Sequence, residues 1–351
     1  MQQGVVVFAG ESSDALARSI CRDLKKVRIN DHSIPVQFLE CQKRGWFNDR
    51  APETQLRHLR NAAYVVIVQS LIPVDSALTQ LLSMCDAAVR ASAQKISVVC
   101  PYFPGRQDKK KHPQVDITAA WIPGVIENVC KGRLDRFVSV DLHSAQIQGY
   151  ANCPFDHLYA LPVLLTEVGR RINVPLSDFT YVSPDSGGVD RVRTLTAGVR
   201  RTKLVIIDKE RLAPGVTAVS EVIGDPGDQC IIVDDIGDSL GTLVEAARAL
   251  KKKHQNARVY GMLTHAVFGG SLNRTRAIAN INDDAVDHLF TTDTIPAAPE
   301  VLATGKVTVV SVAPLLARAL ERIFGGGSLN ELFDQLKKPL RRAPRPMKCL
   351  I

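Results

Sequence analysis

Short runs rich in β-branched residues alternate along the chain with longer segments of helical periodicity. Val5–Ala9 and residues 65–69 are continuous apolar runs, which is typical of strands that are buried on both faces of a parallel sheet. Residues 12–25 and 76–91 carry apolar side chains at helical spacing, and Ser12 or Ser13 is placed to cap the first of these helices. The alternation predicts an α/β fold with mainly parallel sheets flanked by helices.

The alternation begins again in the second half of the chain, after a polar stretch that carries Gly149 and Pro154. A single hydrophobic core rarely grows beyond roughly 250–300 residues, and this chain has 351. We therefore expect two domains that meet near residue 155. No sequence repeat relates the two halves, which leaves open a duplication that only the structure would reveal.

The chain carries 44 Lys and Arg against 36 Asp and Glu, a formal charge of +8. Such a balance suits a nucleic-acid binder, a binder of phosphorylated metabolites, or a near-neutral body with a basic extension. Residues 337–351 hold six of the cations and no acid, which favours the third explanation and predicts a flexible basic tail. Aromatic residues make up only 5% and no nucleic-acid module is recognisable, so no nucleic-acid partner is expected.

Hydropathy and cysteine usage bear on the compartment. No apolar run approaches the roughly 18 residues that a membrane span needs, and the first residues do not resemble a signal peptide. None of the eight cysteines forms a C-x-x-C pair, a pattern typical of reduced thiols. We therefore expect a cytoplasmic protein without a membrane partner.

The strongest local signal is an apolar strand that ends in two acids and is followed by small and hydroxyl residues opening a helix. This segment reads Val233-Asp234-Asp235-Ile236-Gly237-Asp238-Ser239-Leu240-Gly241-Thr242. Free N–H groups at a helix N-terminus favour a phosphate, and adjacent hydroxyls can add donors. The acids can accept hydrogen bonds from sugar hydroxyls or hold a divalent cation. The pattern predicts a site for a phosphorylated sugar, the alternative being a strand end with acidic caps. The chain has neither G-x-x-x-x-G-K-[ST] nor G-x-G-x-x-G, so P-loop and Rossmann interpretations lose their main support.

Further motifs narrow the interpretation. In chain order they are residues 106–110 (Arg-Gln-Asp-Lys-Lys), 141–149 (Asp-Leu-His-Ser-Ala-Gln-Ile-Gln-Gly), 183–188 (Ser-Pro-Asp-Ser-Gly-Gly), 208–211 (Asp-Lys-Glu-Arg), 263–265 (Leu-Thr-His) and 294–296 (Thr-Ile-Pro). Together with the loop, they resemble the ribose-phosphate pyrophosphokinase family, also called phosphoribosyl-pyrophosphate synthetases. The resemblance spans residues 1 to about 335, and the Asp-Leu-His segment is its most specific part.

The resemblance implies two tandem type I phosphoribosyltransferase-like domains, each a mainly parallel sheet flanked by helices. It implies transfer of the β,γ-diphosphoryl group of ATP to O1 of ribose 5-phosphate, giving phosphoribosyl pyrophosphate and AMP, with Mg²⁺ as cofactor. The expected parts are 1–155 (ATP and regulatory side), 156–310 (ribose 5-phosphate loop), 311–336 (helices packing back on the first domain) and 337–351 (the tail). Homo-oligomers built from dimers, up to hexamers, are also implied.

Residue roles follow from the same resemblance. Lys209 and Arg211 match the family's catalytic cations. The positions that match ATP contacts are Phe47, Asp49, Arg106, Gln107, Asp108 and His143. Those that match ribose 5-phosphate contacts are Asp234, Asp235, Asp238, Ser239, Gly241 and Thr242. The positions that match magnesium ligands are Asp141, His143, Asp156 and Asp185.

Three departures from the family pattern stand out. Ala51 occupies the position where the adenine motif should end in Glu, and Glu53 follows two residues late. Pro113-Gln114 replaces a Ser-Arg pair of the regulatory phosphate loop, which predicts altered activation by phosphate and altered inhibition by ADP. Asn152 replaces an Asp of the family pattern in the stretch after His143, which removes one possible metal-binding carboxylate. The altered adenine motif and regulatory loop keep open a second hypothesis, a non-catalytic subunit that regulates an active synthetase. A phosphoribosyltransferase acting on a base is disfavoured by the additional N-terminal domain.

Overall fold

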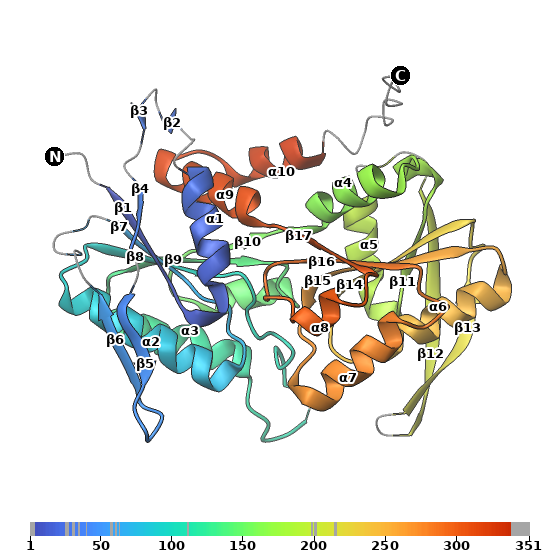
Figure 1. Cartoon of the computed structure of the whole chain (residues 1–351), viewed down its shortest axis with the longest axis horizontal. Helices are drawn as coiled ribbons and strands as arrows, with labels where there is room; N and C mark the ends of the chain where they lie inside the picture. Colours follow the sequence, from blue (N-terminus) through green and yellow to red (C-terminus); the bar gives the residue numbers. More distant parts are fainter. Residues whose placement is uncertain are drawn as a thin grey trace. The chain divides into compact units, whose positions relative to one another are not determined.

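The computed structural model describes residues 4–24, 28–29, 32–33, 36–39, 41–56, 59, 62, 64–110, 112–197, 199, 202–213 and 216–337 (Figure 1). Of the basic tail that the sequence predicts, only Lys337 is among them. The chain forms two compact units. Unit 1 contains Met1–Tyr159, Thr294–Pro296 and Ser311–Leu329, and unit 2 contains Ala160–Asp293, Ala297–Val310 and Asn330–Ile351.

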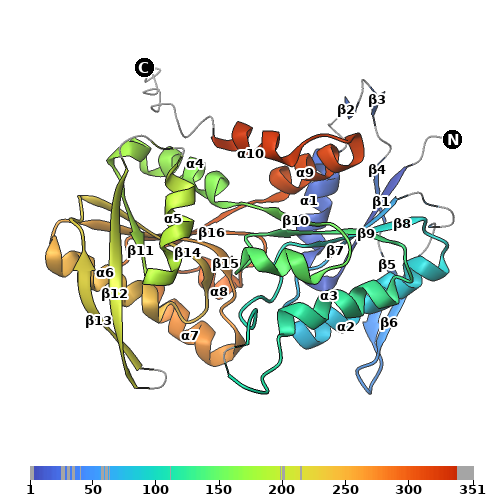
Figure 2. The same ribbon diagram turned by 180° about the vertical axis from the view of Figure 1, so that it is seen from behind.

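Unit 1 is built on a six-stranded sheet with the order β10-β9-β8-β7-β1-β4, in which all neighbours are parallel. Its strands are β1 (Val5–Ala9), β4 (Val36–Phe38), β7 (Tyr64–Val68), β8 (Lys95–Cys100), β9 (Leu134–Val140) and β10 (Phe155–Leu158). Helices α1 (Asp14–Leu24) and α9 (Ala313–Gly325) lie on one face, and α2 (Val74–Arg90) and α3 (Thr118–Val129) on the other (Figures 1 and 2). Two short antiparallel pairs complete the unit, β2 (Arg28–Ile29) with β3 (His32–Ser33) and β5 (Cys41–Trp46) with β6 (Pro52–Leu56).

Unit 2 is built on a seven-stranded sheet with the order β13-β12-β11-β14-β15-β16-β17. Its strands are β11 (Thr180–Ser183), β12 (Lys203–Ala213), β13 (Val216–Ile223), β14 (Gln229–Gly237), β15 (Arg258–Ala266), β16 (His288–Thr292) and β17 (Val307–Val310). Only the β12–β13 pair is antiparallel among the described neighbours. Helices α4 (Leu161–Ile172) and α5 (Val189–Thr196) cover one face, and α6 (Gly241–Lys253) and α7 (Gly270–Ile281) the other (Figure 2). Two further helices are α8 (Pro299–Leu302) and α10 (Leu329–Lys337).

The two sheets share one topology. Counted in chain order within each unit, the six parallel strands follow the order 2-1-3-4-5-6, and unit 2 adds β13 as an antiparallel edge strand beyond β12. Each unit thus has a topological switch point beside its first strand, where ligands of open α/β sheets bind. The duplication that the sequence hides is plain in the strand order. The predicted fold class, tandem domains with mainly parallel sheets flanked by helices, is confirmed.

The predicted elements lie close to the observed ones, and some needed correction. Val5–Ala9 is a strand and Leu161–Ile172 a helix, as expected. The predicted capping role of Ser12 or Ser13 is wrong: a 3₁₀ turn (Glu11–Ser13) precedes α1, and both hydroxyls bind the segment after β7. Ser13 Oγ accepts from Ser70 N at 2.8 Å, and Ser12 Oγ donates to Ser70 O at 2.7 Å.

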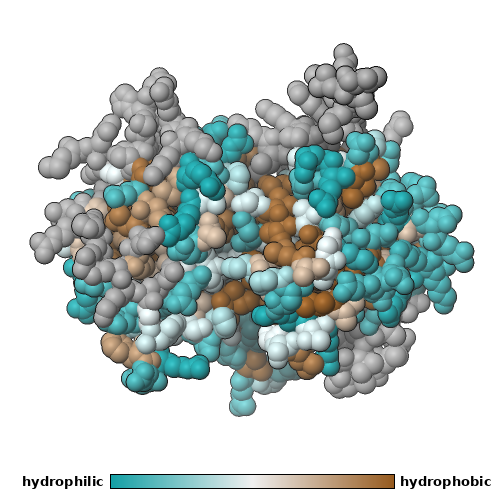
Figure 3. All heavy atoms as spheres, viewed as in Figure 1, coloured by the Kyte–Doolittle hydropathy of each residue, from teal (hydrophilic) through white to brown (hydrophobic). Residues whose placement is uncertain are grey.

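Hydrophilic and hydrophobic residues are interspersed in small groups over the face of the molecule seen in Figure 3. The larger apolar side chains that remain exposed are scattered over several elements, for example Trp121 on α3 and Leu272 on α7. Single exposed apolar residues are normal on globular proteins. Within the described ranges, no helix combines the length and the hydropathy needed to cross a membrane.

Candidate functional site

The segment that the sequence singles out joins β14 to α6 in unit 2. Strand β14 lies between β11 and β15, so its carboxyl end, with Asp234 and Asp235, stands at the switch point of the sheet. Leu240 then adopts a left-handed backbone (φ 61°, ψ 14°), and α6 begins at the next residue, Gly241. The chain therefore turns sharply and presents the start of a helix beside two acids, as the sequence predicts.

Helix α7 and the turn before it hold this loop in place. Asp238 Oδ1 accepts hydrogen bonds from Gly269 N at 3.0 Å and from Asn273 Nδ2 at 3.2 Å. Asn280 Nδ2 donates to the carbonyl oxygen of Ser239 at 2.8 Å. These three hydrogen bonds hold the loop in place from α7 and the turn before it. None of them uses the hydroxyl of Ser239.

The two loop glycines serve different purposes. A Cβ at Gly237 would lie 2.8 Å from side-chain carbons of Leu240 and Leu263, so packing within the protein excludes a side chain there. A Cβ at Gly241 would meet only Ser239 Oγ, at 3.7 Å, which is an ordinary contact. Crowding within the protein therefore does not explain why residue 241 is a glycine. Close approach of a ligand to the start of α6 would explain it.

A cation that the sequence analysis did not identify sits on the two acids. Arg191, on α5, places Nη1 3.3 Å from Asp234 Oδ1 and Nη2 3.1 Å from Asp235 Oδ2. Burial, and then the charge of Asp235, raise the pKa of Asp234, while the charge of Arg191 opposes the rise. The sequence held a weak signal, because α5 follows the Ser-Pro-Asp-Ser-Gly-Gly motif. Its nearness to β14 depends on β11 and β14 being neighbours, which only the sheet order reveals.

Asp185 stands at the end of β11 and organises the same motif. Its Oδ1 accepts from Gly188 N at 2.8 Å, and its carbonyl accepts from Ser183 Oγ at 2.7 Å. A Cβ at Gly188 would lie 2.8 Å from Ser183 Oγ, so this turn needs glycine. The motif thus places a carboxylate at the carboxyl edge of the strand beside β14.

The predicted catalytic cations lie on a hairpin. Strand β12 pairs with β11 as far as Ile206, and beyond that residue it pairs with β13. In this second part Lys209 lies opposite Val219, and Arg211 lies opposite Thr217. Register shifts occur next to both residues. The backbone positions of Lys209 and Arg211 are described, whereas their side chains lie outside the described part of the structure.

In unit 1, the structure brings two predicted ATP-binding segments together. Asp108 is buried, and its carbonyl oxygen accepts from Gln146 Nε2 at 3.1 Å and from the Tyr150 hydroxyl. Gly105 packs against His143 on the same side. The loop with Arg106, Gln107 and Asp108, which follows β8, is therefore tied to the 3₁₀ helix Ala145–Tyr150 after β9. Arg106 is exposed and Gln107 half-buried at this edge.

The predicted magnesium ligands of unit 1 separate into two environments. Asp141 follows β9 with a left-handed backbone (φ 39°), and its N–H donates to Leu158 O at 2.8 Å. Asp156, on β10, forms an ion pair with Arg136 of β9 at 2.9 Å. Among the described residues, no group of three or more His, Cys, Asp and Glu side chains is placed to hold a metal ion. Magnesium usually keeps several waters and binds one or two carboxylates plus substrate phosphates, so Asp141 and Asp185 fit it by donor chemistry.

The predicted adenine contacts lie at the tip of the β5–β6 hairpin. Phe47 is 54% exposed, and Asp49 Oδ1 accepts from Ala51 N at 3.0 Å. Glu53 is on β6 opposite Gly45, below the turn. Ala51, at the position where the family has Glu, is instead part of the turn, where its carbonyl accepts from Phe47 N at 2.9 Å.

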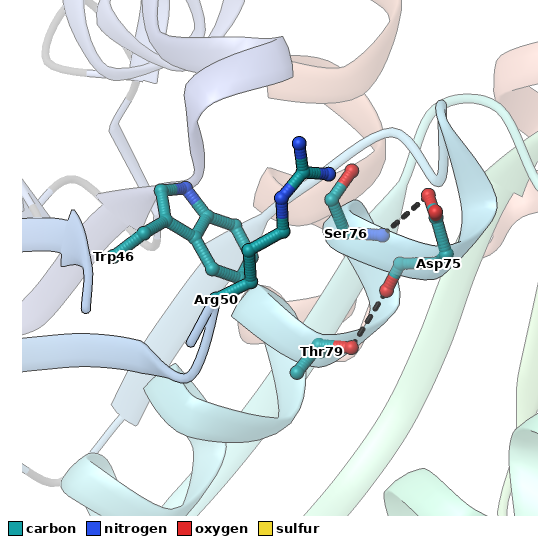
Figure 4. Close-up of a pocket in the computed structure, with 5 residues that line it drawn as sticks. All are labelled: Trp46, Arg50, Asp75, Ser76 and Thr79. Atoms are coloured by element: carbon teal, nitrogen blue, oxygen red, sulfur yellow. Dashed lines mark hydrogen bonds between the residues drawn. The ribbon is translucent and has the colours of Figure 1, made fainter. Parts of the chain in front are cut away.

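A cavity of about 480 Å³ lies beside this tip (Figure 4). Trp46 and Arg50 of the hairpin face the first two turns of α2, which contribute Asp75, Ser76 and Thr79. Asp75 Oδ1 accepts a hydrogen bond from Ser76 N at 2.7 Å. The backbone carbonyl of Asp75 accepts one from the Thr79 hydroxyl at 2.6 Å. Trp46 and Arg50 flank the predicted contacts, and the sequence analysis did not single them out.

Comparison with known proteins agrees with this geometry. The model of the N-terminal domain of ribose phosphate pyrophosphokinase matches residues 5–129, and the model described as phosphoribosyl synthetase-associated domain matches residues 187–334. The ribose-phosphate pyrophosphokinase of Pasteurella multocida is 36% identical over 333 residues, covering 94% of this chain and 99% of that protein. The Haemophilus influenzae enzyme of the same name is 36% identical over 334 residues, with the same coverage.

A solved structure leads to the same family. Phosphoribosylpyrophosphate synthetase from Mycobacterium smegmatis superposes with a TM-score of 0.75 at 28% identity, covering 92% of this chain and all of the other. The match includes both units, in agreement with the duplicated sheet topology. The chain therefore belongs to the ribose-phosphate pyrophosphokinase family.

Proposed function

We propose that the β14–α6 loop binds ribose 5-phosphate while the Arg106–His143 region binds ATP, in the pyrophosphokinase reaction of the family. In that reaction the β,γ-diphosphoryl group of ATP moves to O1 of ribose 5-phosphate, giving phosphoribosyl pyrophosphate and AMP. The observation that carries the proposal is the arrangement at the switch point of unit 2. There two acids, an ordered loop and an unobstructed helix start meet, as binding of a sugar and its phosphate requires.

Each part of this site has a chemical task. The N–H groups at the start of α6, with the hydroxyls of Ser239 and Thr242, bind the 5-phosphate. Asp234 and Asp235 accept hydrogen bonds from ribose hydroxyls. Asp238 orders the loop, since its carboxylate is bound by Gly269 and Asn273.

Diphosphoryl transfer depends on placement and charge neutralisation more than on covalent chemistry. Lys209 and Arg211 supply positive charge to the transferring phosphates, and the hairpin that carries them continues beyond the pairing with β11. Magnesium supplies further positive charge when it is bound. Asp141 and His143 in unit 1 and, separately, Asp185 in unit 2 are proposed magnesium ligands, in each case together with substrate phosphates. Asp156 is the weaker candidate, because its carboxylate is already paired with Arg136.

The nucleotide is bound by residues of unit 1. Arg106, Gln107 and His143 contact the ATP phosphates or base from the segments that the buried Asp108 ties together. Phe47, exposed at the hairpin tip, stacks on adenine, and Asp49 contacts its edge. Since Glu53 does not reach the turn, adenine recognition here proceeds without the family glutamate.

The decisive experiment incubates the purified full chain with ATP, ribose 5-phosphate and magnesium, and measures AMP and phosphoribosyl pyrophosphate. We expect both products in equal amounts, with activity lost on chelation of magnesium and restored by its return. The alternative, a regulatory subunit, predicts no AMP from the chain alone and a changed rate when it is mixed with an active synthetase. If no AMP forms at every concentration of inorganic phosphate tested, the proposal is overturned.

Assembly and location complete the proposal. We infer homo-oligomers built from dimers, which size-exclusion chromatography with light scattering would measure. We infer a cytoplasmic location, supported by the seven described cysteines, none of which is paired in a disulfide. Cell fractionation would test it.

A further inference from the structure

Arg191 joins two elements of the ribose site that are distant in sequence. It is the third residue of α5, which follows the Asp185 turn, and its guanidinium contacts both acids at the end of β14. Its side chain is 24% exposed, whereas that of Asp235 is 5% exposed. The contact with Asp235 is therefore the more shielded of the two, because the side chain of Asp234 is 30% exposed, and shielding from water strengthens an electrostatic interaction relative to one at the surface.

The arrangement of the two acids needs such a cation. Neighbouring side chains of a strand normally point to opposite faces. Here Asp234 Oδ1 also accepts from Asp235 N at 2.9 Å, so this carboxylate folds back over the next peptide group. Two carboxylates held this close repel each other, and a planar guanidinium with two donors can bind both in fixed directions. Burial raises the pKa of Asp234, and the charge of Arg191 counteracts that effect.

We propose that Arg191 is a positioning residue of the ribose site, which holds Asp234 and Asp235 in the orientation that receives the sugar hydroxyls of ribose 5-phosphate. It acts through the acids, without contacting the transferring phosphates. The inference rests on the proposed role of the β14–α6 loop. It predicts that loss of Arg191 affects the sugar more than the nucleotide.

The chain offers a matched control on the same helix. Arg193 lies two residues further along, with a side chain that is 67% exposed and only a long contact of 3.7 Å to the exposed Asp190. Exchange of Arg193 removes the same charge from α5 without touching the acids. Arg191→Lys keeps the charge of Arg191 but loses the two-pronged geometry.

The test measures kcat and the KM values for ribose 5-phosphate and ATP in Arg191→Gln, Arg191→Lys and Arg193→Gln, with the melting temperature of each. A charged hydrogen bond lost in a shielded site corresponds to about a tenfold or larger effect on affinity. We therefore expect Arg191→Gln to raise the KM for ribose 5-phosphate about tenfold, with the KM for ATP within about twofold. Arg191→Lys should restore part of the affinity, and Arg193→Gln should match the unaltered protein.

Calorimetric binding of ribose 5-phosphate to the same proteins separates this inference from the proposed activity. Binding that weakens in Arg191→Gln supports the inference even if the unaltered chain makes no AMP, a result that would overturn only the activity. Unchanged affinity for ribose 5-phosphate, or equal losses for both substrates, would overturn the positioning role. So would failure of the unaltered chain to bind ribose 5-phosphate. If Arg191→Gln does not fold, the comparison of Arg191→Lys with Arg193→Gln decides.

Discussion

Gly105 and His143 are in direct contact in unit 1: a Cβ built on Gly105 would lie 2.9 Å from the Cβ of His143 and 2.8 Å from Ile147 Cδ1. The contact fixes the loop after β8 against the segment after β9. It therefore determines where the Arg106 loop and the histidine lie relative to each other.

Gly105→Ala should disturb this contact. Forcing an extra carbon into a packed site typically costs about 1–3 kcal/mol, and the shift would also move His143. We expect lower stability in urea unfolding and a higher KM for ATP. Gly124→Ala is the control, because a Cβ at that position on α3 meets nothing within 4 Å. Equal stability of Gly105→Ala and the unaltered protein would contradict the packing argument.

Asp238→Ala should loosen the ribose 5-phosphate loop. The change removes the acceptor of Gly269 N and Asn273 Nδ2, which are half-buried, and loss of a hydrogen bond to a charged group costs about 1.5–3 kcal/mol. We expect a lower melting temperature and a higher KM for ribose 5-phosphate. Asp225→Ala, at an exposed position in a loop of the same unit, should change neither value. A KM that stays constant in Asp238→Ala would exclude a role for this carboxylate in ordering the loop.

Lys209→Ala should reduce turnover more than substrate binding. Removal of one group that stabilises transition-state charge typically lowers kcat about 10²–10³-fold. Lys203→Ala, at the exposed start of the same strand, serves as the control for loss of a cation. Steady-state kinetics measure both. Similar kcat values for Lys209→Ala and Lys203→Ala would remove Lys209 from the proposed catalytic group.

His288 should make the stability of unit 2 depend on pH. Burial, and then the positive charges of Arg171 and Lys306, lower the pKa of His288 below its usual 6.5. As the pH falls through 6.5, His288 is protonated in the unfolded chain while it is still neutral in the folded protein. The free energy of unfolding therefore decreases. We expect His288→Gln to flatten this decrease below pH 6.5 in denaturant titrations. An unchanged slope would show that other groups cause it.

The regulatory loop should respond weakly to inorganic phosphate. Pro113 and Gln114 are exposed in a turn, and neither provides the cation or the hydroxyl of the family's Ser-Arg pair. Phosphate titration of the synthetase rate should show little saturable activation. The double change Pro113→Ser and Gln114→Arg should increase it, although Arg must adopt the left-handed backbone of Gln114 (φ 63°). Strong saturable activation of the unaltered chain would contradict the prediction.

The sequence predicted elements whose hydrophobic pattern is local. Val5–Ala9 was identified as a strand because all five of its residues are apolar, and they are buried in the structure. The loop after β14 was identified because its acids, glycines and hydroxyls are consecutive. The hairpin β5–β6 and the helix α3 were not predicted. Strand β5 is largely polar, and α3 contains Pro123, which normally argues against a helix.

Contacts between segments that are distant in the chain could not be predicted from a single sequence. Arg191 meets Asp234 and Asp235 only because β11 and β14 are neighbours in the sheet. The pairing of Asp156 with Arg136 likewise depends on β9 and β10 lying side by side. Neither relation leaves a pattern in adjacent residues, whereas the family motifs do.

The path of the chain has a consequence for how the protein can be divided. Thr294–Pro296 and Ser311–Leu329 belong to unit 1, although the rest of that unit ends at Tyr159. The Ser70 hydroxyl donates to the carbonyl of Thr294, and Phe324 of α9 packs on Tyr64 of β7 with ring centroids 5.4 Å apart. A fragment that stops at Tyr159 would expose the apolar surface that α9 covers. Newly synthesised unit 1 therefore stays incomplete until α9 has been made, and the apolar surface that α9 covers remains open to aggregation during synthesis.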